Sequence, residues 1–215
     1  MRQRQYYVNE VRLGPDTFRV MHPAKPVAHG PLYEAWSGTE MLVSRAGVVD
    51  LTVAWWLAAR SPRTLVYLPL RASGCQAAPD YLERKLDLVL MHHSLGFRPA
   101  RWKDVRGRLT PTGLQKVTLP KKPFPAFGRP DYLRMHHREF RDHLHHKLAA
   151  DTLFLTGSRH AFELEGHGMS ELLDVTPDFH TCAEIVVGIW SGSGSPVERR
   201  NAPELLHVVC CTDHW

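Results

Sequence analysis

Histidine side chains are concentrated in one stretch of the chain, which makes this stretch the first candidate for chemistry. Residues 136–146 contain five histidines together with one glutamate and one aspartate. If the surrounding residues 131–150 form a helix, four of these side chains fall within about 80° of one another at 100° per residue. They are His136, Glu139, His143 and His146. Converging imidazole and carboxylate groups are ligands for zinc or iron, so the spacing predicts a metal site.

The same four residues have a plainer interpretation. Their pattern is not HExxH, and no second motif with the spacing of metal ligands accompanies it. A solvated polar helix face with a Glu139–His143 pair fits the same sequence. The sequence is compatible with both a metal site and a solvated polar face.

His137 differs from its neighbours because it shares the predicted apolar stripe with Phe140 and Leu144. A histidine that faces a core needs partners for both ring nitrogens. We therefore expect either a structural histidine with satisfied nitrogens or a catalytic histidine whose pKa is tuned by partial burial.

Polar side chains also follow two predicted strands. His92 and His93 come directly after one strand, and Ser158 and Arg159 come soon after another. Sheets in α/β proteins place ligand sites at the carboxyl ends of their strands. His92 and His93 are therefore candidate catalytic groups, and a helix that begins near Ser158 offers its backbone amides to a phosphate or carboxylate. The alternatives are an N-cap role for Ser158 and a surface ion pair for Arg159.

Charge is distributed unevenly along the chain, whose overall net charge is +5. Residues 151–215 hold ten acidic and three basic residues, a net charge of −7. Residues 98–122, the basic tract, hold eight basic residues against Asp104 alone, a net charge of +7. Arg101 and Lys103 in this tract are candidate contacts for an anionic ligand. Either the acidic and basic parts pack together and cancel, or the tract receives coenzyme A phosphates or an acidic carrier protein.

Several other function classes find little support in the sequence. There is no GxSxG elbow and no phosphate-binding P-loop, and the SGSGS run at residues 191–195 is not a dinucleotide fingerprint. Cys75 lies in a predicted turn and is a weak nucleophile candidate. Phe97 and Trp102 accompany the basic tract, but no nucleic-acid-binding module is recognisable, so a nucleic-acid partner is not expected.

The elements that must position these residues follow from hydrophobic periodicity and turn residues. Helices are predicted at residues 48–60, 80–86, 101–109 and 131–150, with a helical or mixed stretch from about 159 to 175. Strands are predicted as a hairpin at residues 5–13 and 17–21, and at 64–70, 86–91, 116–119, 152–155, 183–190 and 204–211. Residues 22–38 are expected to be a loop, the proline-rich residues 111–130 a connector or flap, and residues 191–203 a lid or long hairpin.

Helices interleaved with apolar strands predict a single α/β domain over residues 1–215, with an α+β arrangement as the alternative. We expect a mixed sheet in which the N-terminal hairpin and the last two strands form antiparallel edges. The four cysteines form no CxxC pair and are expected to be reduced. The sequence shows neither an apolar leader nor a run long enough to span a membrane, which favours a cytoplasmic protein.

Three segments resemble blocks of an uncharacterised family of actinobacterial proteins. They are residues 87–103 (DLVLMHHSLGFRPARWK), 150–159 (ADTLFLTGSR) and 185–200 (IVVGIWSGSGSPVERR), together about a fifth of the chain. The resemblance implies a bacterial protein of specialised metabolism, of the polyketide type. It supplies no catalytic residues.

These observations predict a small biosynthetic protein that binds an anionic or carrier-attached acyl intermediate. His92, His93 and His137 would transfer protons, and Arg159 would supply positive charge. The alternatives are a non-catalytic partner subunit of a larger biosynthetic enzyme and a metal-dependent enzyme built on residues 136–146. No cofactor is assigned. The leading hypothesis requires these imidazoles and the guanidinium to line one cavity.

Overall fold

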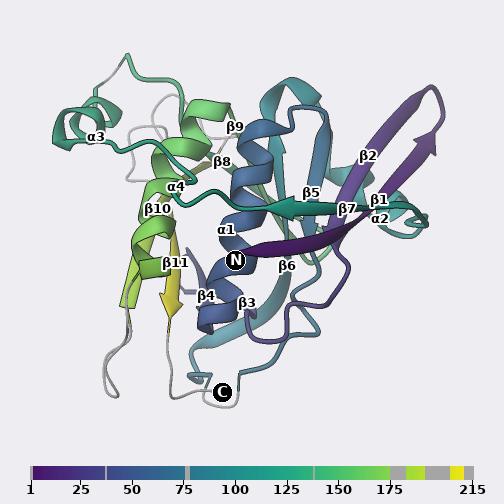
Figure 1. Ribbon diagram of the computed structural model, residues 1–215, viewed down its shortest axis with the longest axis horizontal. Helices are drawn as coiled ribbons and strands as arrows, with labels where there is room; N and C mark the ends of the chain where they lie inside the picture. The colour runs from purple at the N-terminus through teal and green to yellow at the C-terminus, as the bar shows by residue number, and fades with distance from the viewer. Residues whose placement is uncertain are drawn as a thin grey trace.

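The computed structural model describes residues 2–36, 38–75, 78–137, 139–174, 183–191 and 204–210 (Figure 1). The strands in these ranges are β1 (Gln3–Leu13), β2 (Asp16–Pro23), β3 (Leu32–Ala35), β4 (Gly38–Val43), β5 (Thr64–Leu68), β6 (Leu82–His92), β7 (Pro111–Thr118), β8 (His145–Ala149), β9 (Thr152–Gly157), β10 (Ala183–Ser191) and β11 (Glu204–Cys210). The helices are α1 (Arg45–Arg60), η1 (His93–Leu95), η2 (Pro99–Arg101), α2 (Trp102–Arg106), α3 (Arg129–Met135) and α4 (Arg159–Asp174).

The described strands form one mixed sheet, as the sequence predicts. Their order is β3-β4-β11-β10-β8-β9-β6-β5-β2-β1-β7. An additional pairing between β3 and β6 closes the part from β3 to β6 into a barrel. The strands β5, β2, β1 and β7 continue from β6 as an open arm that ends in the predicted N-terminal hairpin and β7. The last two strands, β10 and β11, are antiparallel but lie within the barrel rather than at an edge.

The two faces of the sheet cover two separate cores. Along β6, Leu88 and Leu90 point to the larger core, whereas Val89 and Met91 point to the smaller one. The larger core holds α1 and α4, which pack against each other (Figure 1): Trp55 Nε1 donates to the carbonyl of Phe162 at 2.8 Å. The smaller core is covered by α2, so α4 and α2 lie on opposite faces of the sheet.

Helix α1 forms where the apolar run predicts a helix, and it begins three residues earlier. The Ser44 side chain caps it by accepting a hydrogen bond from the backbone N–H of Gly47 at 3.2 Å. Most of its side chains from Val48 to Ala59 are buried, because the helix is covered by the sheet on one side and α4 on the other.

The predicted helix at residues 131–150 is wrong. A short helix, α3, ends at Met135, and residues 145–149 form β8 between β9 and β10. Of the apolar stripe that suggested a helix, only Leu144 is fully buried, and the Leu133 side chain is half exposed. Residues 145–149 therefore form a strand, because pairing with β9 and β10 outweighs the helical pattern of the local sequence.

Two further predictions fail because their partner strands were not recognised. Residues 80–86 contain the start of β6 rather than a helix, and residues 32–35 form β3 within a predicted loop. The two segments pair with each other, for example Leu32 with Leu86. Residues 111–118 of the predicted flap form β7 against β1, so the strand predicted at residues 116–119 is present and begins five residues earlier.

Some sequence predictions fall partly outside the described residues. Cys75 and Cys210 are free thiols, whereas Cys182 and Cys211 lie outside the described ranges. Residues 192–203 of the predicted lid, which include Arg199 and Arg200, also lie outside them. In the described ranges, no helix combines the length and the apolar character needed to cross a bilayer.

Candidate functional site

Imidazoles from two distant parts of the chain meet where β6 and β9 end and β8 begins. His145 of β8 pairs with Thr156 of β9, which in turn pairs with Met91 of β6. Directly paired residues point to the same face, and Met91 belongs to the smaller core. His145 therefore faces the α2 side of the sheet. His92 and His93 follow Met91, and their ring centroids lie 4.5 Å apart.

Electrostatic neighbours define the extent of this site. We refer to His92, His93, Asp142, His143 and His145 as the histidine cluster. Asp142 raises the pKa of His92, His143 and His145, and His93 lowers the pKa of both His92 and His145. The register of β6, β9 and β8 brings the three segments that carry these side chains to the same end of the sheet, and the mutual effects on pKa agree with that placement.

Three members of the cluster have pKa values below that of an ordinary histidine. Burial is the main cause for His92, His143 and His145, and neighbouring imidazoles lower each pKa further. The Asp142 carboxylate opposes this shift in all three. These imidazoles are therefore neutral at pH 7, the state in which each ring has one proton to donate and one lone pair to accept.

Hydrogen bonds distinguish the nitrogens of two of these rings. Nδ1 of His92 accepts from the backbone N–H of Ser94 at 3.2 Å, so the proton of the neutral ring resides on Nε2. His145 bonds to the backbone carbonyl of Trp190, which leaves its other nitrogen as an acceptor. The cluster thus pairs an N–H donor on His92 with a lone pair on His145, the combination that general acid–base chemistry uses.

His143 is the member with the most aromatic surroundings. Its ring lies 4.1 Å from that of Trp190 and 4.8 Å from that of Phe140, measured between centroids. A hydrogen bond to the backbone carbonyl of Phe140 raises the pKa of this ring and so opposes the effect of its burial. Trp190 and Phe140 thereby give the cluster an apolar wall.

The basic tract runs through η2, α2 and β7. Its first part lies on the same face of the sheet as His145, because α2 packs Trp102 and Val105 into the smaller core, whereas β7 and the residues after it contribute Val117, Leu119 and Phe124 to the larger core. Arg101 is paired: its Nη1 lies 2.5 Å from a carboxylate oxygen of Asp16, and its guanidinium lies over the Phe18 ring. A hollow of about 470 Å³ lies beside it and includes Phe97 and Arg98.

Most of the basic tract is not neutralised. Arg101 and Arg106 form ion pairs, while the other six basic side chains are exposed and have no ion pair with a described residue. These six are Arg98, Lys103, Arg108, Lys116, Lys121 and Lys122. In the same ranges, acidic residues from 151 onward pair elsewhere, such as Asp174 with Arg2. Of the two alternatives that the sequence left open, neutralisation of the tract by ion pairs with the acidic third is therefore not found in these ranges.

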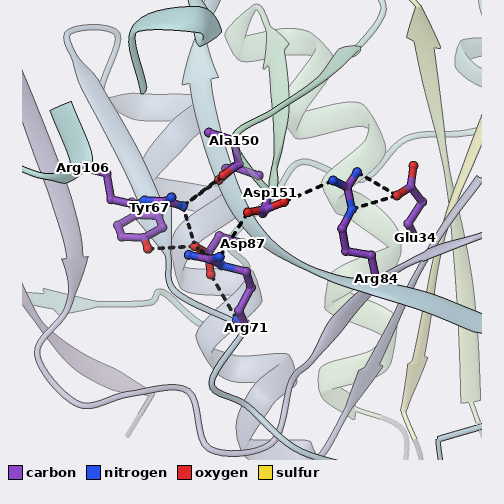
Figure 2. Close-up of polar contacts among 9 residues, drawn as sticks. Glu34, Tyr67, Arg71, Arg84, Asp87, Arg106, Ala150 and Asp151 are labelled. Atoms are coloured by element: carbon purple, nitrogen blue, oxygen red, sulfur yellow. Dashed lines mark hydrogen bonds and ion pairs between the residues drawn. The ribbon is translucent and has the colours of Figure 1, made fainter. Parts of the chain in front are cut away.

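A buried carboxylate in the middle of β6 fixes the position of α2 (Figure 2). Asp87 accepts hydrogen bonds from Tyr67 Oη at 3.1 Å, from Arg71 Nε at 3.0 Å and from Arg106 Nη1 at 3.3 Å. Burial and the adjacent Asp87 raise the pKa of Tyr67, which remains a donor. Because Arg106 belongs to α2, this network holds the basic helix on the sheet.

The network continues to the turn between β8 and β9 (Figure 2). Asp151 pairs with Arg71 and with Arg84, and Arg84 also pairs with Glu34 at 2.8 Å. Three arginines thus face three carboxylates, Glu34, Asp87 and Asp151. The balanced charge indicates a structural network rather than an anion site.

The other predicted site residues lie outside the histidine cluster. His137 is exposed in the turn after α3, because the helix ends before it and it does not face the core. Ser158 caps α4 by accepting from the N–H of Ala161 at 3.0 Å. Arg159 pairs with Glu163, whose carboxylate also pairs with Arg60. Lys103 is exposed on α2.

The four predicted metal ligands do not share a helix face. His136 caps α3, Glu139 is exposed in the following turn, and His146 in β8 lies 3.0 Å from the carboxylate of Glu204. His143 belongs to the histidine cluster instead. Among the described residues, no three histidine, cysteine, aspartate or glutamate side chains come together as a metal-binding group.

The sequence did not point to several residues that form the histidine cluster and the Asp87 network. Asp142, His145 and Trp190 were not singled out, because the helix expected at residues 131–150 hid the pairing of β8. A carboxylate inside the apolar run LDLVLM was an available signal for Asp87. No protein-family model, no curated protein and no solved structure matches this chain.

Proposed function

We propose that this protein binds an anionic acyl intermediate, as a coenzyme A ester or on an acidic carrier protein, and transfers protons on it at the histidine cluster. One observation carries the proposal: His145 lies beside His92 and His93 on the face of the sheet that carries α2, with Arg98, Arg101 and Lys103 of the basic tract. A negatively charged carrier bound at the tract would place its acyl group next to neutral imidazoles.

The chemistry follows from the protonation states. A neutral imidazole with a free lone pair, as on His145, can remove a proton next to a carbonyl. The Nε2–H of His92 can donate to the oxygen on which negative charge then develops. The exposed basic side chains accelerate encounter with an acidic partner more than they increase final affinity. The resemblance to actinobacterial proteins supports a role in polyketide-type metabolism, in the cytoplasm of a bacterium.

Binding can be tested with coenzyme A and with pantetheine, which lacks the phosphates. We expect coenzyme A to shift the NMR signals of the His92 and His145 rings and of the α2 amides, with an affinity that falls as salt is added. Replacing Arg98 and Lys103 by alanine should weaken binding about tenfold. The matched control replaces Lys121 and Lys122, which lie beyond β7.

Catalysis can be tested by exchange of the α-proton of a β-ketoacyl-coenzyme A in D₂O. H92Q and H145Q should each slow this exchange at least tenfold without unfolding the protein. Salt-independent binding, or equal losses in the arginine–lysine variant and its control, would contradict the proposed surface. Binding without any catalysed exchange would replace the enzymatic proposal by the non-catalytic partner role.

A further inference from the structure

A groove of about 540 Å³ opens at the N-terminal end of α1, away from the histidine cluster. Its walls come from β1, the connection between β2 and β3, the first turns of α1, and β7. The sixteen residues of α1 span about 24 Å, and β5, which follows its other end, starts beside the end of β6. The groove and the histidine cluster therefore lie near opposite ends of this helix.

Positive charge predominates in the groove. Arg4, Lys25 and Lys116 line it from three separate segments, and Asp50, which pairs with Arg4, is the acidic residue in its wall. Lys25 and Lys116 are exposed and have no ion pair within the part of the chain that the structure describes. Two positive charges thus remain uncompensated in one concave surface.

The backbone of α1 adds donors to the same groove. Ser44, Ala46 and Gly47 line it; the N–H of Gly47 is already accepted by the Ser44 hydroxyl, which leaves the N–H of Ala46 as the donor in the wall. The first turn of a helix has N–H groups without intrahelical partners and carries partial positive charge. A Cβ on Gly47 would lie 2.3 Å from the carbonyl oxygen of His29, so only glycine allows the connection to approach the helix this closely. This close contact between Gly47 and the connection at His29 forms part of the groove wall.

A buried hydroxyl lies behind the groove wall, on the strand that supplies Arg4. Tyr6 is fully buried, and its Oη has no hydrogen-bond partner in the described ranges. Burial, with the Asp50 carboxylate as a second cause, raises its pKa far above that of an ordinary tyrosine. Arg4 and Tyr6 are two residues apart on β1 and so point to the same face of the strand, where Arg4 lines the groove and Tyr6 is buried behind it. Buried donors of this kind normally have an acceptor.

We propose that this groove binds the phosphate group of a small ligand, as a phosphomonoester or a diphosphate. Lysine ammonium groups act as point charges for phosphate, and helix N-termini present backbone donors to its oxygens. The volume is within the range of small-molecule sites. The site is distinct from the one assigned to the acyl intermediate, so either proposal can fail without the other.

The test titrates the full chain with inorganic phosphate and with pyrophosphate, at ionic strength held constant with chloride. Amide NMR signals of Ala46 and Gly47 should shift, and pyrophosphate should bind more tightly than phosphate. The double variant K25Q/K116Q should lose about tenfold or more in affinity. The double variant K121Q/K122Q removes the same charge outside the groove and should change the affinity less than twofold.

Two results would overturn the proposal. One is an equal loss of affinity in both double variants, which would mean diffuse attraction by surface charge. The other is a set of pyrophosphate-induced shifts that omits Ala46 and Gly47. H92Q, which alters the histidine cluster, should leave pyrophosphate binding unchanged, and this control separates the two sites.

Discussion

Arg106 of α2 donates from Nη1 to the backbone carbonyl of Ala150 at 3.1 Å. The acceptor belongs to a turn in an unusual conformation, because Ala150 and Asp151 have φ values of 49° and 54°. Left-handed backbone is unfavourable for alanine, by roughly 1–2 kcal/mol. The same guanidinium also holds Asp87, so a single side chain joins the basic helix, a buried carboxylate and a strained turn.

The strain in this turn leads to a first prediction. A150G should raise the free energy of unfolding by about 0.5 kcal/mol, because relief of the left-handed alanine exceeds the entropy that glycine adds to the unfolded chain. The carbonyl that Arg106 contacts is unchanged. Urea denaturation measures the difference. A149G, one residue earlier in β8, is the matched control and should lower stability; a decrease of equal size in both variants would contradict the argument.

The buried carboxylate of Asp87 leads to a second prediction. D87N should lower the free energy of unfolding by about 2 kcal/mol, because Arg71 and Arg106 lose their charged partner while retaining partial access to water. Hydrogen exchange should accelerate specifically at the amides of α2. D104N alters an exposed carboxylate on the same helix and should change stability by less than about 0.5 kcal/mol. Unaltered exchange in D87N would show that this network does not hold α2.

The histidine cluster leads to a third prediction, which concerns Asp142. Its carboxylate raises the pKa of His92, His143 and His145. D142N should therefore lower all three pKa values together, which NMR titration of the imidazole C2 protons measures. D151N, at the other end of β8, should leave them unchanged. If the three rings responded independently, the cluster would not exist as described.

A fourth prediction concerns Glu165 of α4. Its carboxylate accepts the N–H of Gly188 in β10 at 3.3 Å, and burial raises its pKa from 4.5 to about 7. Between these values the folded protein holds a proton that the unfolded chain has lost, so this group makes stability fall as pH rises through the window. The effect is on the order of 3 kcal/mol at 1.36 kcal/mol per pKa unit.

The variant E165Q separates this effect from that of the histidines. Histidines with lowered pKa values act in the opposite direction, because the folded state binds fewer protons and gains stability as pH rises towards 6.5. The difference in unfolding free energy between E165Q and the unmodified protein should therefore grow in favour of E165Q from pH 5 to pH 8. E171Q, on the exposed side of α4, should show a constant difference; a constant difference in E165Q as well would refute the assignment.

The sequence predicts best those elements whose pattern is local. The apolar run at the centre of α1 and the run TLVYL of β5 are almost entirely buried. Their apolar composition alone predicts that they are core elements. The N-terminal hairpin is equally local, because its two strands are adjacent in the chain. These elements establish the α/β class, and the apolar run LDLVLM of β6 places His92 and His93 at the end of a strand.

Elements defined by distant partners are not visible in the sequence. β3 is four residues long and depends on pairing with β4 and β6. β8 has the largely exposed sequence HHKLA. Its residue spacing fits a helix that continues from residue 131, but pairing with β9 gives it an extended backbone. For this reason the proximity of His145 to His92 could not be derived, although both residues lie in conspicuous histidine-rich segments.

The position of β11 has a consequence for how this chain is made. β11 stands between β4 and β10, so the ring of strands cannot close until residues 204–210 have left the ribosome. Until then, β4 and β10 both present open backbone edges, to which other nascent chains could add. Deleting this one strand should therefore favour aggregates over a smaller soluble fold, and delayed translation near residue 200 should prolong dependence on chaperones.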